Sequence, residues 1–107
     1  MLLISAGVFA STQEEIDYLL DFVSNTDCQY NRNGTDYDGK AARDHIAMKY
    51  EYYLDDIKTT EDFIRYSATS SKISGKKYRI KCPGSEIVNA NDWLLYELQN
   101  YREKELR

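Results

Sequence analysis

Few side chains in this sequence could perform acid-base or nucleophilic chemistry. His45 is the only histidine, so any Ser-His or Cys-His catalysis would have to use it. Ser70 and Ser71 are the candidate nucleophiles, and a small hydrolase would pair one of them with His45. A structural role explains His45 more simply, as a hydrogen bond from its helix to a neighbouring hairpin. We therefore expect no enzyme and name no catalytic residue, with the hydrolase as the alternative.

Motifs for cofactors and metal ions are missing from the sequence. It contains neither a P-loop nor a GxGxxG fingerprint, and no GxSxG elbow surrounds Ser70 and Ser71. A zinc site is poorly supported, because there is one histidine and the two cysteines lie far apart without CxxC spacing. No EF-hand spacing occurs either. We expect no cofactor and no bound metal.

Six polar or amphipathic side chains come from three separate segments and are not needed for a simple core. If they converge, they form either a polar network that locks a hairpin to a helix or a small pocket that accepts an anion. Buried, mutually bonded side chains would favour the network, and an open concavity would favour the pocket. This candidate group consists of Arg32, Tyr37, His45, Lys49, Ser70 and Ser71.

The segment 72–81 holds five cations and no acid, with Tyr78 among them. Basic residues interleaved with an aromatic ring could grip a polyanion. Lysines that guard a solvated sheet edge are the commoner cause of such a pattern. The net charge of −4 argues against a dedicated nucleic-acid binder, which needs a dominant positive field. The match of Asn33-Gly34-Thr35 to a glycosylation sequon is better explained by the turn that Asn-Gly favours.

The first ten residues, MLLISAGVFA, are apolar and uncharged. Val8 and Ala10 fit the −3 and −1 positions of a signal cleavage site, and the run is too short to span a bilayer. We interpret residues 1–10 as the end of a secretory signal, or as an apolar N-terminal extension packed on the core. The positively charged n-region of a signal peptide is missing, which suggests that the true start of the protein lies upstream or that this chain is truncated. Residues 11–107 are expected to form a single domain.

Cys28 and Cys82 make the export hypothesis testable. An even number of cysteines in a small exported chain suggests one disulfide. Closing a loop of this length would add stability on the order of 4 kcal/mol. In a cytosolic chain, both residues would instead be buried free thiols.

Hydrophobic periodicity and capping residues predict an α+β fold of about four helices packed on a small antiparallel sheet, stapled by one disulfide. Asn33-Gly34 is the sequence of a type I′ turn, which predicts a hairpin over 28–37. Strict alternation over 77–82 predicts a further strand, with Tyr78 and Ile80 facing in. The predicted helices are 12–25, 39–57, a short one that begins at Thr59 or Thr60, and 91–104.

Three pairs of adjacent carboxylates lie at the ends of the predicted helices. Helix capping explains Glu14-Glu15 and Glu61-Asp62, because acidic side chains stabilise a helix N-terminus. Asp55-Asp56 falls at a predicted C-terminus, where negative charge is unfavourable, and the sequence offers no account of it.

A set of spaced residues along the chain carries a family resemblance: Cys28, Arg32-Asn33-Gly34, Tyr37, Ala42, His45, Lys49-Tyr50, Thr60-Glu61, Phe63-Ile64, Ser70-Ser71, Ser74-Gly75, Tyr78, Cys82 and Asp92-Trp93-Leu94. In these residues and their spacing the chain resembles the YfeK-like family of small bacterial periplasmic proteins, a domain of unknown function. The resemblance spans Glu14 to Leu98, and it implies an exported, periplasmic protein with Cys28 paired to Cys82. It implies no assigned reaction.

Three functions remain open at this level. The leading hypothesis is a non-enzymatic periplasmic module, monomeric and without a membrane span. It would bind another envelope protein or an anionic envelope component through the hairpin and the basic strand. The first alternative is the hydrolase that uses His45 with Ser70 or Ser71. The second is an assembly or stability factor that acts through a tyrosine-rich surface, because ten of the 107 residues are tyrosines.

Overall fold

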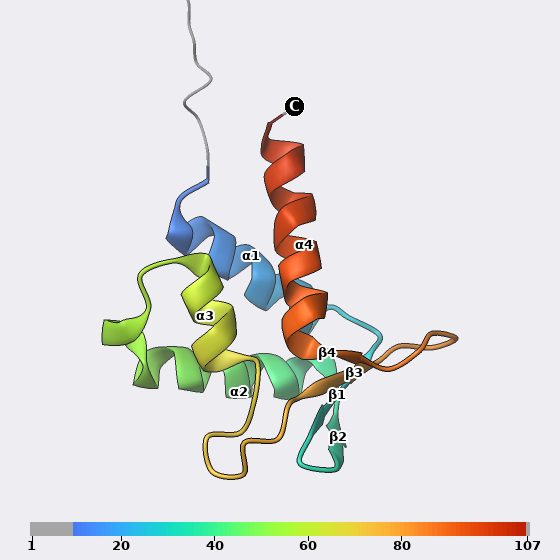
Figure 1. The fold of residues 1–107 in the computed structure, drawn as a ribbon. Helices are drawn as coiled ribbons and strands as arrows, with labels where there is room; N and C mark the ends of the chain where they lie inside the picture. The colour runs from blue at the N-terminus through green and yellow to red at the C-terminus, as the bar shows by residue number, and fades with distance from the viewer. Residues whose placement is uncertain (1–9, 107) are drawn as a thin grey trace, which may run out of the picture.

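The computed structural model describes residues 10–106, so the interpretation of residues 1–10 falls outside this range apart from Ala10. Its helices are α1 (Thr12–Ser24), α2 (Gly39–Tyr52), α3 (Thr60–Ser67) and α4 (Ala90–Glu105), with a short 3-10 helix, η2 (Leu54–Asp56). Its strands are β1 (Gln29–Arg32), β2 (Thr35–Tyr37), β3 (Arg79–Lys81) and β4 (Val88–Asn89). They form an antiparallel sheet in the order β2-β1-β3-β4 (Figure 1). The predicted α+β class is confirmed.

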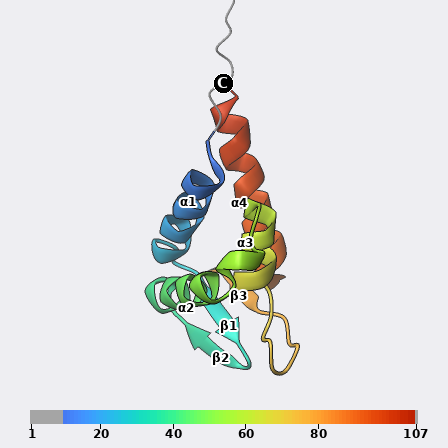
Figure 2. The same cartoon turned by 90° about the vertical axis from the view of Figure 1, so that its left-hand side faces the viewer.

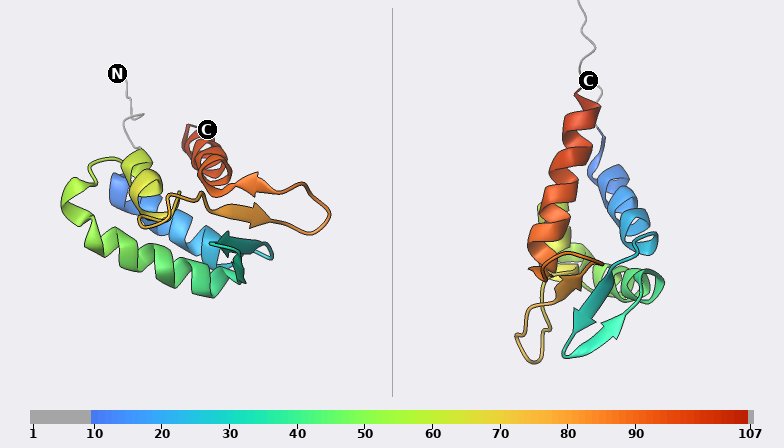
Figure 3. Two further views of the ribbon diagram at one scale, coloured as in Figure 1. Left: turned by 60° about the horizontal axis from the view of Figure 1, so that its bottom comes forward. Right: turned by 90° about the vertical axis from the view of Figure 1, so that its right-hand side faces the viewer.

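The hydrophobic core lies between the helices and the inner face of the sheet. Helix α2 contacts β1 and β2, which lie near its N-terminal end, whereas α4 contacts β3 and β4 (Figures 1 and 3). Helices α1 and α3 contact both α2 and α4 and so close the core on the side away from the sheet (Figure 2). The buried residues are Ile16, Leu19, Leu20, Val23, Tyr30, Ala42, Ile46, Phe63, Ile64, Ala68, Tyr78, Ile80, Ala90, Leu94 and Leu98.

The predicted hairpin is present as β1 and β2. Asn33 and Gly34 have φ values of 52° and 86°, the left-handed pair that an Asn-Gly turn supplies at low steric cost. Tyr30 pairs with Tyr37 on one side and with Ile80 of β3 on the other. Both Tyr30 and Ile80 are buried, and the Tyr30 hydroxyl donates a hydrogen bond to the Ala68 carbonyl at 2.5 Å. Tyr30 thereby ties the sheet to the end of α3.

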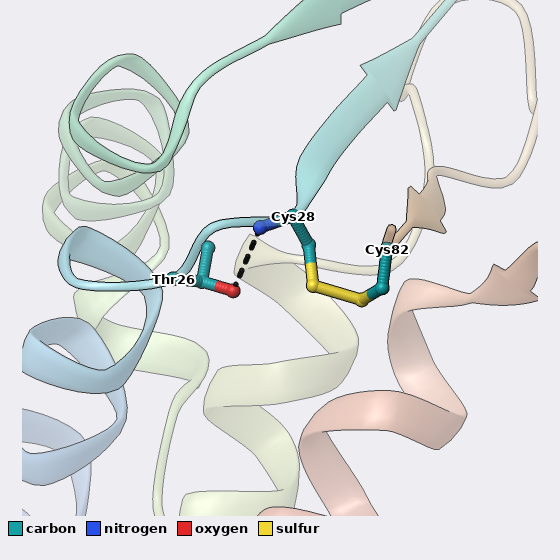
Figure 4. The surroundings of a disulfide bond; sticks show 3 residues. All are labelled: Thr26, Cys28 and Cys82. Carbon is teal, nitrogen blue, oxygen red and sulfur yellow. Dashed lines mark hydrogen bonds between the residues drawn. A yellow bond between two sulfur atoms is a disulfide. The ribbon is translucent and has the colours of Figure 1, made fainter. Parts of the chain in front are cut away.

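A disulfide joins Cys28 to Cys82, as the resemblance implies. These residues extend the β1–β3 pairing by one position beyond Gln29 and Lys81, and their Cα atoms are 4.2 Å apart. That separation is typical of the close, non-hydrogen-bonded pairs of an antiparallel sheet. Thr26 orients the start of the strand, since its hydroxyl accepts a hydrogen bond of 3.1 Å from the Cys28 N–H (Figure 4).

Helix α2 is shorter than the predicted range of 39–57. It ends at Tyr52, and the chain continues as η2 before Ile57 becomes extended. Leu54, an apolar residue within the predicted range, is 53% exposed. With no buried contact at Leu54, packing does not hold the last predicted turn in a regular helix. Asp55 and Asp56 are therefore exposed residues of the 3-10 turn, away from the end of α2.

In each carboxylate pair at the starts of α1 and α3, one residue caps the helix and the other does not. The interpretation that both members of each pair are capping residues is therefore wrong. Glu14 and Asp62 complete capping boxes with Ser11 and Thr59. Their neighbours, Glu15 and Glu61, instead bind the guanidinium of Arg102 on α4, at 2.8 Å and 2.7 Å respectively. Glu15 is buried and also accepts a hydrogen bond of 2.5 Å from the Thr60 hydroxyl. This group ties α1, α3 and α4 together away from the sheet.

Gly39 gives the first testable prediction. A Cβ at this position would lie 2.4 Å from the Val23 carbonyl oxygen, where the start of α2 passes the end of α1. Helix propensity alone favours alanine, but the backbone contact should dominate. We expect Gly39→Ala to lower the free energy of unfolding in urea by about 1–3 kcal/mol. Lys40→Ala is the exposed control, expected within about 0.5 kcal/mol of wild type. A Gly39→Ala variant as stable as wild type would contradict the predicted contact.

Candidate functional site

Arg32, Tyr37 and His45 meet where the hairpin packs against α2. The guanidinium carbon of Arg32 lies 4.1 Å from the centroid of the Tyr37 ring, a cation–π contact between diagonal neighbours of the hairpin. Arg32 Nη1 lies 3.3 Å from His45 Nε2. Because arginine stays protonated, it donates this hydrogen bond, so Nε2 accepts and Nδ1 carries the imidazole hydrogen. The predicted link from His45 to the hairpin is therefore present.

His45 is held in its neutral form. Burial, followed by the positive charges of Arg32 and Lys49, lowers the pKa of His45 to about 4. Its Nε2 is already occupied by the Arg32 guanidinium. Among the hydrogen bonds of residues 10–106, none joins His45 to Ser70 or Ser71, which is the contact that the hydrolase alternative requires.

Lys49 lies one turn after His45 on α2 and connects the helix to the loop of residues 68–77. Its Nζ donates hydrogen bonds to the Ser70 carbonyl at 2.9 Å and to the Tyr78 hydroxyl at 3.3 Å. The Tyr78 ring also packs edge-on against His45, with centroids 6.0 Å apart. Tyr78 therefore joins the Arg32 and Lys49 halves of the group, a role that its inward-facing strand position alone did not reveal.

The two candidate serines are held mainly by the turn chemistry of their loop. Ser71 is buried, and its hydroxyl oxygen accepts a hydrogen bond of 3.2 Å from the Ser74 N–H. Its own N–H donates to the Lys76 carbonyl, and its carbonyl accepts from the Gly75 N–H. Ser70 and Ser71 line a concavity together with Lys49, whereas Arg32, Tyr37 and His45 do not line it. The six candidate residues thus divide into a bonded network and part of an open surface.

The cations of this group are not neutralised by acids. Within the described range, neither Arg32 nor Lys49 forms an ion pair with a carboxylate. Burial, Arg32 and Lys72 all lower the pKa of Lys49. Arg32 Nε is buried without a hydrogen-bond partner among the described atoms. Aromatic rings and a neutral imidazole therefore position these charges, and the local potential stays positive.

A basic concavity of about 450 Å³ lies on the outer side of the sheet, between the hairpin turn, the loop of residues 68–77 and β3. The hairpin tip and the loop lie side by side in two views (Figures 1 and 2), and the Ser74 hydroxyl donates a hydrogen bond of 2.9 Å to Asn33 Oδ1. The residues that line the basic concavity are Asn31, Asn33, Gly34, Lys76, Lys77, Arg79 and Asn89.

One row of paired residues runs across the basic concavity. Asn31 of β1 pairs with Arg79 of β3, which pairs in turn with Asn89 of β4. Cross-strand partners point to the same face of a sheet, so this row lies opposite the buried row that contains Tyr30 and Ile80. Asp36 continues the row beyond Asn31, and Lys81 binds its carboxylate at 3.1 Å. The face therefore presents amides and cations, with its nearest acid already paired.

In residues 10–106, no three histidine, cysteine, aspartate or glutamate side chains gather as they would around a metal ion. None of the helices there combines the length and apolar character needed to cross a bilayer.

The environment of His45 predicts how stability changes with pH. The pKa is about 4 when folded and 6.5 for an unperturbed histidine. The unfolded chain therefore binds more protons between these values, so stability should fall as pH drops from about 6.5 towards 4. The urea midpoint of wild type should be lower at pH 5 than at pH 7. His45→Gln, which retains an acceptor for Arg32, should lose less, and equal losses in both proteins would contradict the assignment.

Comparison with known proteins identifies a family for this chain but no function. Neither the curated proteins nor the solved structures contain a significant match to the chain. Residues 10–102 match a family of unknown function, DUF5329. This match agrees with the expected domain of unknown function, and the YfeK-like name itself stays a prediction. With nearly all of its described residues covered, the chain belongs to the DUF5329 family.

Proposed function

We propose that this protein is a non-enzymatic binding module of the bacterial envelope, which holds an anionic envelope component in the basic concavity. The apolar residues 1–10 support export to the periplasm. The disulfide supports it too, since such bonds persist in oxidising compartments. The resemblance to the YfeK-like family favours the same location. In this proposal the protein binds its ligand and catalyses no reaction.

One observation carries the choice of ligand. Lys76, Lys77 and Arg79 are all exposed around one concavity, in a chain whose net charge is −4. None of the described residues that line this concavity is acidic. Such a separation of charge gives a positive face that attracts and orients an anionic partner, although the whole molecule is negative.

The form of the basic concavity favours an extended anionic chain over a small molecule. The row from Asn31 through Arg79 to Asn89 crosses three strands, with amide groups on both sides of one guanidinium. Asn31 donates one hydrogen bond to Asp36, and its second N–H and the Asn89 amide can donate to phosphate or carboxylate oxygens. Arg79 and the two lysines supply charge. The ligand class is therefore a polymer with repeating phosphate or carboxylate groups.

Binding to two synthetic polyanions tests this function. We expect the oxidised protein to bind polyphosphate or poly-L-glutamate more weakly at 200 mM than at 50 mM salt. Arg79→Ala should reduce affinity roughly fivefold to tenfold. It should also make the slope of log K against log salt concentration shallower by about one, because one fewer counterion is released. Isothermal titration calorimetry or fluorescence anisotropy would measure both quantities, and the preferred polymer would identify the anionic group.

A matched charge change provides the control. Lys77→Glu and Lys58→Glu alter the net charge equally, but Lys58 is exposed outside the basic concavity. Lys77→Glu should abolish most of the binding, whereas Lys58→Glu should have a small effect. Equal losses in these variants would indicate non-specific attraction, and no binding of either polymer at 50 mM salt would overturn the proposal.

A further inference from the structure

A second concavity, of about 330 Å³, lies between α2, α3 and the loop of residues 68–77. Lys49, Ser70 and Ser71 line it from the side of the candidate group. It shares no lining residue with the basic concavity. We name it the α2–α3 concavity, and its contacts differ in kind from those of the sheet face.

Two tyrosine rings in the α2–α3 concavity each contact one cation. The rings of Tyr53 and Tyr66 pack against each other with centroids 5.4 Å apart and an interplanar angle of 32°. Lys72 Nζ lies 5.3 Å from the Tyr53 centroid, and the Arg65 guanidinium carbon lies 4.8 Å from the Tyr66 centroid. A cation–π contact holds the charge without using its N–H groups. Arg65 still uses Nη2 to bind Asp62, whereas the ammonium hydrogens of Lys72 have no partner among the described residues and remain available to a ligand.

Lys49 and the two serines supply further donors at the same place. An ammonium group has three hydrogens, and those of Lys49 have two protein acceptors, the Ser70 carbonyl and the Tyr78 hydroxyl. The Ser71 hydroxyl accepts a hydrogen bond but donates none among the described residues, and the Ser70 hydroxyl has no partner among them. One ammonium hydrogen and two hydroxyl groups are therefore left for an acceptor.

Charge in the α2–α3 concavity is only partly balanced. Arg65 forms an ion pair of 2.7 Å with Asp62, whereas Lys49 and Lys72 form none within the described range. Three cations thus face one carboxylate. Burial is the main cause of the lowered pKa of Lys49, and the charges of Arg32, outside the concavity, and of Lys72, inside it, lower this pKa further. An anion between these groups would relieve the repulsion.

We propose that the α2–α3 concavity is a binding site for a terminal phosphate group, separate from the polyanion surface on the sheet. A phosphate monoester carries nearly two negative charges at neutral pH and has three terminal oxygens to accept hydrogen bonds. Lysine ammonium groups bind phosphate as point charges, and serine hydroxyls complete its hydrogen bonding. The concavity falls at the small end of ligand-site volumes, which suits one such group rather than a large ligand.

Titration of the oxidised protein by ¹⁵N NMR tests this site. We expect glycerol 3-phosphate and inorganic phosphate to shift the amide signals of Ser70, Ser71 and Lys72 in a saturable way, and glycerol to leave them unchanged. Lys72→Ala removes an exposed cation and should weaken binding roughly tenfold with the fold intact. Ser70→Ala should weaken it less. The absence of saturable shifts, or equal shifts with glycerol, would overturn the proposal.

Two further arms identify the source of the phosphate and separate this site from the proposed polyanion surface. Vesicles with phosphatidic acid in phosphatidylcholine should sediment the protein if the group belongs to a lipid, and Lys72→Ala should abolish this. Sedimentation unaffected by Lys72→Ala would count against the site. Lys77→Ala, in the basic concavity, should leave the affinity for glycerol 3-phosphate unchanged, so either proposal can fail alone. A loss with Lys77→Ala equal to that with Lys72→Ala would contradict a separate site.

Discussion

The pairing of β1 with β3 is the constraint on which the rest of the structure depends. It joins the half of the chain that contains α1 and α2 to the half that contains α3 and α4, and the Cys28–Cys82 bond fixes its register. A slip of β3 by one residue would turn Ile80 towards solvent and Arg79 towards the core, because neighbouring side chains point to opposite faces. Both the buried network and the basic face of the sheet follow from this register.

The protein uses its acids and its aromatic rings for different purposes. Glu15 and Glu61 neutralise Arg102 between the helices, and Asp62 caps a helix while it pairs with Arg65. Arg32 and Lys49 lie against the rings of Tyr37 and Tyr78 instead, and Lys72 lies against Tyr53. An ion pair consumes both charge and hydrogen-bond donors, whereas a ring contact leaves the donors free. The tyrosine-rich composition is therefore physically linked to a positive surface on an acidic protein.

The sequence correctly predicted the turns and helix caps, whose conformations depend on residues close together in the chain. The predictions of the Asn33-Gly34 turn and of the capping roles of Glu14 and Asp62 were correct because neighbouring residues define these features. The end of α2, the two-residue strand β4 and the partner of Glu15 depend on contacts between distant segments. The same limit applies to the candidate site. The sequence predicted a hydrogen bond from the helix of His45 to the hairpin, and Arg32 makes it. Whether all six candidate residues converge depends on the path of the loop that holds Ser70, which leaves no local signal.

The lengths of the outer strands bear on how this protein can assemble with others. The edges of the sheet are β2, with three residues, and β4, with two. Such short edges expose few unpaired backbone groups, so they offer little template for edge-to-edge aggregation or for a strand donated by a second chain. A partner of this fold must therefore be recognised by side chains and charge rather than by extension of the sheet.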